Sequence, residues 1–181
     1  DGIFMSQAEI DKLTFNQDGV GNTTLRPGDI RYVDLNSDGI LDWRDQDVIG
    51  KGTFPEVVYS LVMGATYKGL SLEMLWQGST GFNFYVTGAA ASMFSNESIP
   101  YDYHYTYRWQ PDPANPTQNI NPKAQLPAAS LGLNPNNIKR SDFWMKDATF
   151  IRLRNVNLSY SFSGNWTKKL GFKNLQVFRS E

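Results

Sequence analysis

The sequence contains no cysteine and a single histidine, His104, among its 181 residues. The missing thiols exclude disulfides, thiolate metal sites and cysteine nucleophiles. One imidazole gives no support to histidine-based catalytic triads or to histidine-rich zinc sites. A glycine-rich phosphate loop of the GxxxxGK type is absent as well. These absences remove the commonest kinds of active site, and we do not expect the chain to be an enzyme.

The chain also lacks a strong net charge and any long apolar run. It has 17 Lys and Arg against 18 Asp and Glu, a formal net charge of −1. Such a balance creates no basic field to attract nucleic acid, so no nucleic-acid partner is expected. Without 18 consecutive apolar residues, no transmembrane helix is expected. Aromatic residues are abundant, at 14%, and many of them fall in alternating patterns that indicate strands.

The segment DLNSDGILDWRD, residues 34–45, has the spacing of a calcium-binding loop. Oxygen-bearing side chains fall at its first, third, fifth, ninth and twelfth positions, and Gly39 is sixth, where such a loop must bend sharply. The seventh position would use its backbone carbonyl. The sequence therefore predicts a structural calcium ion, and the predicted ligands are Asp34, Asn36, Asp38, Ile40, Asp42 and Asp45. The alternative is a solvated acidic turn.

The flanking residues argue against an EF-hand sensor, which requires a helix on each side of its loop. Upstream, DIRYVDL has an extended pattern after the turn at Pro27-Gly28. Downstream, QDVIGKGTFPEVVY carries two glycines and a proline, so no useful helix follows.

Residues 57–77 alternate as two strands joined by a tight turn at Lys68-Gly69. Apolar residues occupy one face, and small or polar residues occupy the other. A half-buried hairpin of a soluble sheet and a hairpin of a membrane barrel both fit this alternation. Strand lengths near ten residues and aromatics at the ends of the apolar band favour the barrel. The apolar face is predicted to hold Tyr59, Leu61, Met63, Tyr67, Leu70, Leu72, Met74 and Trp76.

A third strand is predicted from Phe150 and a fourth over LQVFRS, residues 175–180, with one helical turn in NWTKKLG, residues 165–171, between them. The apolar face of the third strand is predicted to hold Val156, Leu158, Tyr160 and Phe162. Arg152 and Arg154 fall on this face too, so that end of the strand is expected outside the hydrocarbon, where arginine would be costly.

About seventy residues without steady periodicity separate the second and third strands. They include YDYHYTYRW, which places five aromatic side chains on one side if it is extended. Such a face could stack on sugar rings or peptide side chains, or pack on a neighbouring loop, and packing is the favoured interpretation because Tyr and Trp bury well. The candidate substrate or partner contacts are Tyr101, Tyr103, Tyr105, Tyr107 and Trp109.

Several ordered blocks resemble the SusC/RagA-like TonB-linked outer membrane proteins of Bacteroidetes. They are RPGDIRYVDLNSDGILDWRDQDVIG followed by the hairpin, then RWQPDPANP, SDFWMKDATFIRLRNVNLSYSF and LGFKNLQVF. The resemblance implies an all-β fold, part of a transmembrane barrel of about 22 antiparallel strands with long extracellular loops. It also implies an N-terminal plug, a SusD-like surface lipoprotein as lid, energy supplied through TonB, and import of oligosaccharides, glycans or peptides.

On this resemblance, residues 1–181 are a C-terminal part of such a barrel in the outer membrane, in contact with its lipid. Residues 28–50 would form the calcium-like extracellular loop, 57–77 a transmembrane hairpin, 78–147 an extracellular excursion and 148–181 further strands. The plug, the TonB box and the final strands do not occur in this sequence. The alternative hypothesis is a soluble, calcium-stabilised β module that binds glycans or a protein partner.

Overall fold

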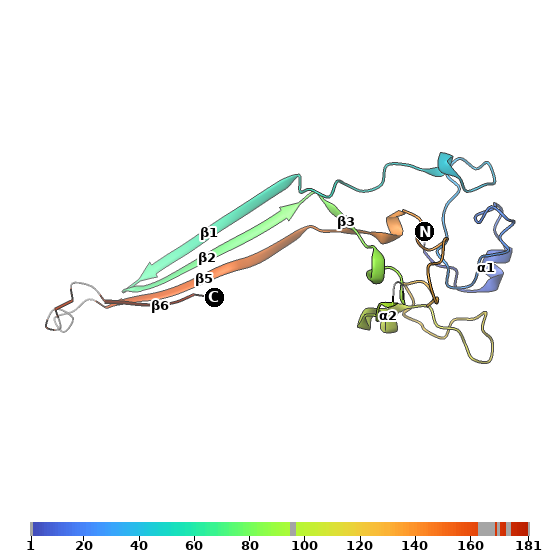
Figure 1. Ribbon diagram of the computed structural model, residues 1–181. Helices are drawn as coiled ribbons and strands as arrows, with labels where there is room; N and C mark the ends of the chain where they lie inside the picture. The colour runs from blue at the N-terminus through green and yellow to red at the C-terminus, as the bar shows by residue number, and fades with distance from the viewer. Residues whose placement is uncertain (1, 95–96, 163–168, 170, 173–174, 181) are drawn as a thin grey trace. The chain divides into compact units, whose positions relative to one another are not determined.

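The computed structural model describes residues 2–94, 97–162, 169, 171–172 and 175–180. Helices are short, and antiparallel strands provide most of the regular structure (Figure 1), which confirms the predicted all-β class. The described strands form an open sheet and do not close a barrel. The elements are α1 (Gln7–Asp11), η1 (Trp43–Asp45), β1 (Val57–Tyr67), β2 (Leu70–Thr80), β3 (Asn83–Tyr85), η2 (Gly88–Ala90), α2 (Asp102–Tyr107), η4 (Asp142–Trp144), β4 (Met145–Asp147), β5 (Phe150–Phe162) and β6 (Leu175–Ser180).

The chain divides into two compact units. Unit 1 comprises Asp1–Gly50 and Tyr85–Lys146, and unit 2 comprises Lys51–Phe84 and Asp147–Glu181. Among the described residues, no helix is long and apolar enough to cross a bilayer. The helical turn predicted for residues 165–171 falls outside the described residues, apart from two positions.

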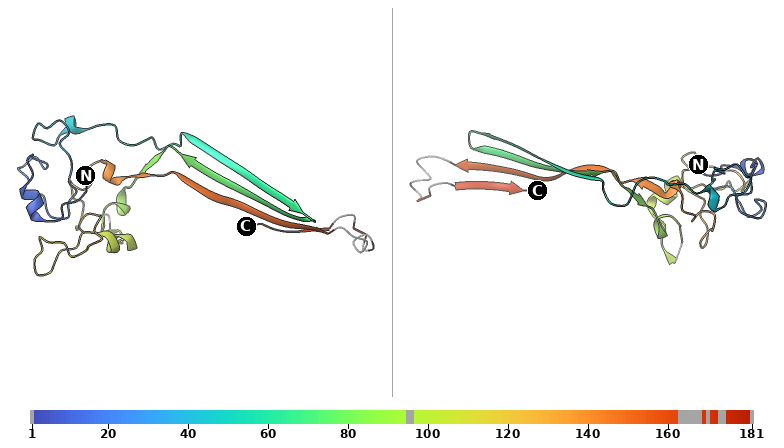
Figure 2. Two further views of the ribbon diagram at one scale, coloured as in Figure 1. Left: turned by 180° about the vertical axis from the view of Figure 1, so that it is seen from behind. Right: turned by 90° about the horizontal axis from the view of Figure 1, so that it is seen from above.

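Unit 2 is built on a four-stranded sheet in the order β1-β2-β5-β6, in which every neighbouring pair is antiparallel. Figure 2 shows these strands side by side in both of its views. The predicted hairpin is confirmed, and β2 continues to Thr80, beyond its predicted end at Gln77. The strands predicted from Phe150 and over residues 175–180 are confirmed as β5 and β6. A separate two-stranded sheet pairs β3 with β4.

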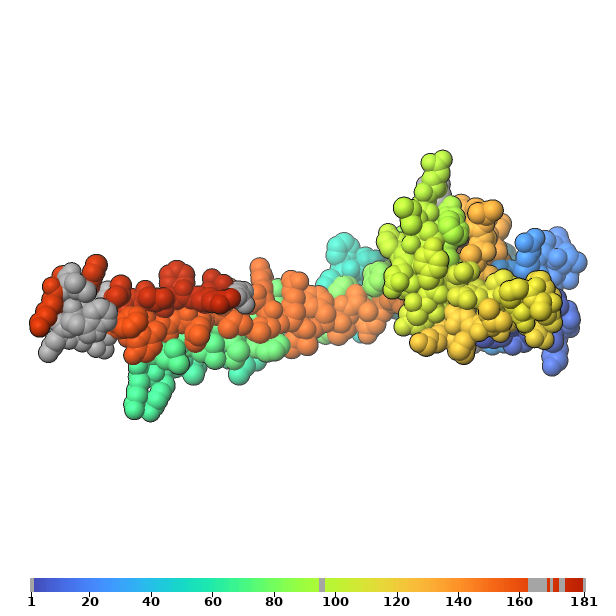
Figure 3. Space-filling view, turned by 90° about the horizontal axis from the view of Figure 1, so that it is seen from below, coloured from blue at the N-terminus to red at the C-terminus, as the bar shows by residue number. Residues whose placement is uncertain are grey.

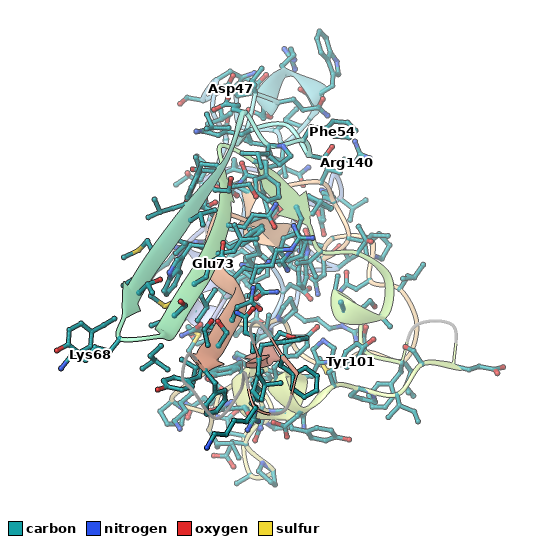
Figure 4. The ribbon with its side chains drawn as sticks, turned by 90° about the vertical axis from the view of Figure 1, so that its left-hand side faces the viewer. Asp47, Phe54, Lys68, Glu73, Tyr101 and Arg140 are labelled. Atoms are coloured by element: carbon teal, nitrogen blue, oxygen red, sulfur yellow. The ribbon has the colours of Figure 1, made fainter. Side chains whose placement is uncertain are left out.

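The turn between β1 and β2 requires its glycine. Lys68 and Gly69 have φ angles of 48° and 89°, and positive φ at both central residues is the geometry of a tight hairpin turn. A Cβ at Gly69 would lie 2.7 Å from the carbonyl oxygen of Ser161. The Ser161 amide donates to the Gly69 carbonyl at 2.8 Å. The turn is therefore fixed against β5, and Lys68 projects from the tip of the hairpin (Figure 4).

Register places the apolar side chains of adjacent strands opposite one another, because residues paired across a ladder share a face. Leu61 pairs with Trp76, and Leu72 is the partner of both Ala65 in β1 and Leu158 in β5. The apolar face therefore continues without interruption from β1 through β5. It comprises Tyr59, Leu61, Met63, Ala65 and Tyr67 of β1, Leu70, Leu72, Met74 and Trp76 of β2, and Val156, Leu158 and Tyr160 of β5.

A β-bulge in β5 corrects the expectation for the two arginines. Leu75 pairs with Asn155, but the next residue of β2, Trp76, pairs with Leu153. The extra residue, Arg154, shifts the alternation by one position, and a shift of one reverses the faces. Leu153 thereby joins the apolar face, and Arg152 pairs with Gln77 on the polar face. The prediction that Arg152 and Arg154 lie on the apolar face of β5 is wrong, because the bulge interrupts the alternation of side chains on which it was based.

Large apolar side chains remain exposed on this sheet. Leu61 is 56% exposed, Leu158 45% and Tyr67 70%. A half-buried sheet of a water-soluble domain would cover one face with other elements. The described residues of unit 2 provide no such cover, and the large apolar side chains of its sheet stay exposed.

Unit 1 has a core of its own, made largely by loop residues. Ile3, Ile30, Trp109 and Trp144 form one buried cluster, and Phe4, Ile10 and Leu25 form a second. The indole of Trp144 donates to the Asn137 carbonyl at 2.8 Å, so this buried ring satisfies its polar group.

Buried amide side chains connect distant segments of unit 1. Gln17, 1% exposed, donates to the Ile30 carbonyl at 2.8 Å and to Asn136 Oδ1 at 2.9 Å, and accepts from the Tyr32 amide at 3.0 Å. Asn137 Oδ1 accepts from the Ile30 amide at 2.8 Å. Because buried backbone groups must find partners, these amides replace the ladder hydrogen bonds that the loops lack.

Replacing Gln17 with Ala tests this network. The change leaves the Tyr32 amide without its acceptor, and we expect it to lower the free energy of local unfolding by about 1–3 kcal/mol. The measurement is hydrogen exchange at the Tyr32 amide in the full-length protein. Gln7→Ala is the control, because Gln7 makes a surface bond to Asp11 and should change stability by no more than about 0.5 kcal/mol. Equal exchange rates in the two variants would contradict the network's role.

Candidate functional site

The predicted calcium loop is closed by hydrogen bonds between its backbone and the predicted ligand side chains. Asp34 Oδ2 accepts from the Gly39 amide at 2.8 Å, and Asn36 Oδ1 accepts from the Asp38 amide at 2.8 Å. Asp38 Oδ1 accepts from the Ile40 amide at 3.1 Å. Gly39 has a φ of 87°, which confirms the sharp bend predicted at the sixth position.

Asp45 holds the two ends of the loop together. One of its oxygens accepts from the amides of Leu35 at 2.9 Å and Asn36 at 3.3 Å, and the other accepts from the Asp42 amide at 2.8 Å. The bond from Asp42 is the main cause that lowers the pKa of Asp45; partial burial opposes it and the other two amides reinforce it. The carboxylate at the twelfth position is thus ionised and central to the loop.

Arg44 introduces a positive charge among these acids. One of its terminal nitrogens lies 2.8 Å from Asp38 Oδ2 and 2.8 Å from Asp42 Oδ2. The hydrogen bond from Arg44 is the main cause that lowers the pKa of Asp42. Sequence reasoning did not single out Arg44, because a cation is not a metal ligand. Only the folded loop shows that Arg44 is a counter-charge to Asp38 and Asp42.

The fit of a cation to this loop depends on the oxygens that remain. Within the described part of the chain, no three acidic or histidine side chains already converge as a metal site. Asp34 Oδ1, however, is enclosed and has no hydrogen-bond partner among the described residues. An enclosed carboxylate oxygen without a partner is costly, and a cation would satisfy it. Hydrogen bonds therefore fix the backbone of the loop, and Asp34 Oδ1 is left without a partner that a cation could provide. Calcium binding at this loop stays a prediction.

A second loop, residues 16–24, lies against the first. Asn16 and Ile40 form a parallel bridge: the Asn16 amide donates to the Gly39 carbonyl at 2.8 Å, and the Leu41 amide donates to the Asn16 carbonyl at 3.0 Å. Beside them, an open cavity of about 370 Å³ is lined in part by Phe15, Tyr32 and Asp34.

Asp18 organises the second loop. Its carboxylate accepts from the amides of Val20 at 2.8 Å, Asn22 at 2.7 Å and Thr24 at 2.8 Å, and from the Thr24 hydroxyl at 2.8 Å. Partial burial would raise the pKa of Asp18, but these hydrogen bonds outweigh it and lower the pKa to about 2. Sequence reasoning missed this residue; the turn-forming Asp18-Gly19 pair was the available signal.

The predicted extended aromatic stretch is instead a helix, α2. His104, 1% exposed, accepts from the Tyr101 amide through Nδ1 at 3.0 Å and lies 3.1 Å from the Ala90 carbonyl through Nε2. The hydroxyl of Tyr103 donates to the same carbonyl. The bond from Tyr101 lies within the helical turn, whereas Ala90 is 13 and 14 residues away from Tyr103 and His104. An alternating pattern of aromatics could reveal neither contact.

The helix separates the candidate contact residues. Tyr101, Tyr105 and Tyr107 remain exposed at 51%, 55% and 40%, whereas Trp109 is 3% exposed and belongs to the core. Tyr103 stacks on Tyr101 with ring centroids 5.7 Å apart. The prediction of a single aromatic face is therefore wrong. Of the five candidate contact residues, only the three exposed tyrosines are available to a partner. Residues of this segment, in yellow-green, lie at the surface of unit 1 in Figure 3.

Comparison with known proteins points to one family, although no family model matches the chain. The chain is 28% identical over 177 residues to TonB-dependent receptor P26 of Formosa agariphila, a match that covers 98% of the chain and 16% of that receptor. Among solved structures, it resembles the RagAB peptide importer in the open-open state, with a TM-score of 0.50, 18% identity, and coverage of 78% of this chain and 14% of the other.

A second structure of that importer, in the closed-closed state, matches with a TM-score of 0.45 and 18% identity over 80% of this chain and 16% of the other. The chain spans about a sixth of the length of the receptor. Together, the receptor match and the shared fold confirm the resemblance to SusC/RagA-like TonB-dependent receptors.

Proposed function

We propose that this chain forms part of the barrel wall and an outer loop region of an outer membrane TonB-dependent transporter. The observation that carries the proposal is the uncovered apolar face of unit 2, whose register continues from β1 to β5. β1 and β2 each have 11 residues, the length that crosses a bilayer at a tilt. The bulge removes Arg152 from the apolar face, where it would be costly in lipid.

The proposal also orients the strands. Tight turns of such barrels lie on the periplasmic side and long connections lie outside. The turn at Lys68-Gly69 is then periplasmic, and the residues of unit 1 are extracellular. A soluble β module, the alternative, would require a cover for the apolar face, and this requirement weighs against it.

Substituting opposite faces of β1 tests the membrane assignment. Leu61→Arg, in the middle of the apolar face, should impair barrel assembly of the full-length protein by about 2–4 kcal/mol. Ser60→Arg introduces the same charge on the polar face and should be tolerated. The measurement is the yield of heat-modifiable protein in the outer membrane fraction. If both variants assemble equally well, the apolar face does not meet lipid.

We further propose that the exposed tyrosines Tyr101, Tyr105 and Tyr107, in α2 and at its N-cap, contact a SusD-like lid lipoprotein, an imported oligosaccharide or peptide, or both. Tyrosine suits such a surface because its ring buries a large area and its hydroxyl still finds a hydrogen-bond partner. The buried His104 fixes the helix from behind, so the rings are held in place before a partner arrives.

The triple variant Tyr101→Ala, Tyr105→Ala and Tyr107→Ala tests this surface. It should weaken co-purification of the lid lipoprotein or growth on the imported nutrient, while heat-modifiability of the barrel is unchanged. Leu131→Ala with Leu133→Ala is the control, since these side chains of unit 1 are 95% and 60% exposed. Unchanged lid binding and unchanged growth in the triple variant would contradict the assignment.

We propose finally that the loop of residues 34–45 binds a structural calcium ion that stabilises an extracellular segment. The ligands would be the oxygens of Asp34, Asn36, Asp38, Asp42 and Asp45 with the Ile40 carbonyl, at about 2.3–2.6 Å. The partnerless Asp34 Oδ1 supports the proposal. Binding would draw Asp38 and Asp42 away from Arg44, because one carboxylate oxygen cannot serve both cations equally.

Asp38→Ala tests the ion. It should lower the melting temperature of the full-length protein, and a chelator should lower that of the parent protein by the same amount. The two losses should not add, because both remove the same ion. Asp47→Ala, outside the predicted ligand set, is the control and should keep the response to the chelator. A parent protein whose melting temperature ignores the chelator would refute the calcium site.

A further inference from the structure

Strand β6 extends the apolar face of unit 2 and adds a charge to it. Tyr160 of β5 pairs with Val177 of β6, and Leu158 pairs with Arg179. Residues paired across a ladder share a face, so Val177 continues the apolar face and Arg179 interrupts it. Across the described strands β1, β2, β5 and β6, Arg179 is the only charged residue in the register of this face.

The position of Arg179 along the sheet is near the hairpin turn. Its partner Leu158 is three residues from Ser161, whose amide donates to the Gly69 carbonyl in the turn at 2.8 Å. Three residues span about 10 Å along a strand. In the proposed orientation the turn is periplasmic, so Arg179 lies near the periplasmic end of the lipid-facing surface. The cost of an arginine in lipid falls toward the membrane surface.

A row of tyrosines lies between Arg179 and the turn. Tyr67 pairs with Leu70, and Leu70 pairs with Tyr160, so the two tyrosines share one row of the apolar face. They are 70% and 40% exposed. Tyrosines on the lipid-facing side of a barrel are typical of the level at which hydrocarbon meets the headgroups.

Arg179 can reach this row. It follows Val177, the partner of Tyr160, by two residues, about 7 Å along the strand. Diagonal neighbours of this kind are within reach of long side chains. Near a membrane surface, arginine buries its aliphatic stem and extends its charged group to the headgroup level. The exposed guanidinium of Arg179 and the Tyr160 hydroxyl can therefore meet a ligand together.

The chemistry of this position suits a phosphate that carries acyl chains. A guanidinium binds phosphate through two parallel hydrogen bonds, and a phenol hydroxyl donates one more. On the side of Arg179 away from the tyrosines, the face continues with Met63, Met74 and Val156. A soluble anion would leave these side chains uncovered, whereas a phospholipid places its phosphate at the cation and its chains along them.

We propose that Arg179 and Tyr160 bind the phosphate of a phospholipid in the periplasmic leaflet. The inference rests on the proposed function, in which this face meets lipid, and deepens it by naming a lipid that the barrel wall holds. The contact explains how an arginine stays on a lipid-facing strand, because its charge is satisfied at the headgroup level.

The test counts the lipids that stay bound to detergent-purified full-length transporter, by native mass spectrometry. The probes are dioleoylphosphatidylglycerol and dioleoylglycerol, which has the same chains and no phosphate. The parent protein should retain more of the phospholipid at equal lipid concentration. Arg179→Gln should retain about one phospholipid fewer than the parent protein, because one charge-assisted phosphate contact is lost. Its retention of dioleoylglycerol should be unchanged.

Three further variants separate the site from a general effect of charge. Tyr160→Phe removes only the hydroxyl and should weaken retention of the same lipid, and adding it to Arg179→Gln should cost no second lipid, since both act on one site. Arg179→Lys keeps the charge and should retain more phospholipid than Arg179→Gln. Arg152→Gln makes the same charge change on the polar face and should keep the phospholipid count of the parent protein.

The inference fails if Arg179→Gln retains as much phospholipid as the parent protein, or if it loses both probes equally. It fails as well if Arg152→Gln loses the same amount, because the effect would then follow total charge. A lower melting temperature of Arg179→Gln with an unchanged lipid count also overturns it, since Arg179 would then serve an acidic group of the protein itself.

Heat-modifiability in the outer membrane fraction separates this inference from the function on which it rests. A heat-modifiable barrel whose phospholipid count does not depend on Arg179 overturns the inference and leaves the transporter intact. Parent protein that is absent from the outer membrane fraction overturns both.

Discussion

The alternation of side chains along a strand is the constraint on which the sheet depends. Because its period is two, a single extra residue exchanges the apolar and polar faces from that point onward. Arg154 is such a residue, and β5 accommodates it as a bulge between the pairs Leu75–Asn155 and Trp76–Leu153. The apolar face extends past the bulge with Leu153, whereas Arg152 turns to the polar side. One irregularity thus keeps Arg152 off the apolar face of β5, and the same irregularity gathers cationic side chains on the opposite face.

A different constraint shapes unit 1, in which long segments without regular ladders must still satisfy their backbone groups. Side chains provide the partners. Asp18 and Asp45 each accept from three backbone amides, and Gln17 bridges Ile30, Tyr32 and Asn136. Carboxylates that accept several amides stay ionised, so their contribution to stability is present at neutral pH and is lost as the pH falls through their lowered pKa values. Loops held this way can present side chains, such as the tyrosines of α2, without a sheet or helix bundle beneath them.

The strands and turns that depend on local periodicity could be predicted from the sequence. Both strands of the hairpin, its Lys68-Gly69 turn and the starts of β5 and β6 follow from alternation and turn chemistry, which are local. The bulge does not, because the parity of β5 alone cannot say which residue pairs with Trp76. Helix α2 was not predicted for a similar reason. The ring nitrogens of His104 contact the Tyr101 amide and the Ala90 carbonyl, and an alternating pattern of aromatics does not indicate such contacts. In the calcium-like loop the spacing predicted the bend at Gly39, but not the counter-charge of Arg44 between the acids. The family resemblance is the basis for proposing what no local rule could indicate, lipid as the environment of the exposed face.

The central claim is that the bulge sets which side of β5 faces lipid, and cysteine accessibility across it is the most direct measurement. This chain has no cysteine of its own, so single substitutions within it report without background. In full-length protein in native outer membranes, Leu153→Cys should resist a water-soluble maleimide and react with a lipid-soluble one, and Arg152→Cys should do the reverse. If Arg152→Cys reacts from the lipid and Leu153→Cys from water, the strand has no functional bulge and the proposed assignment of faces is incorrect.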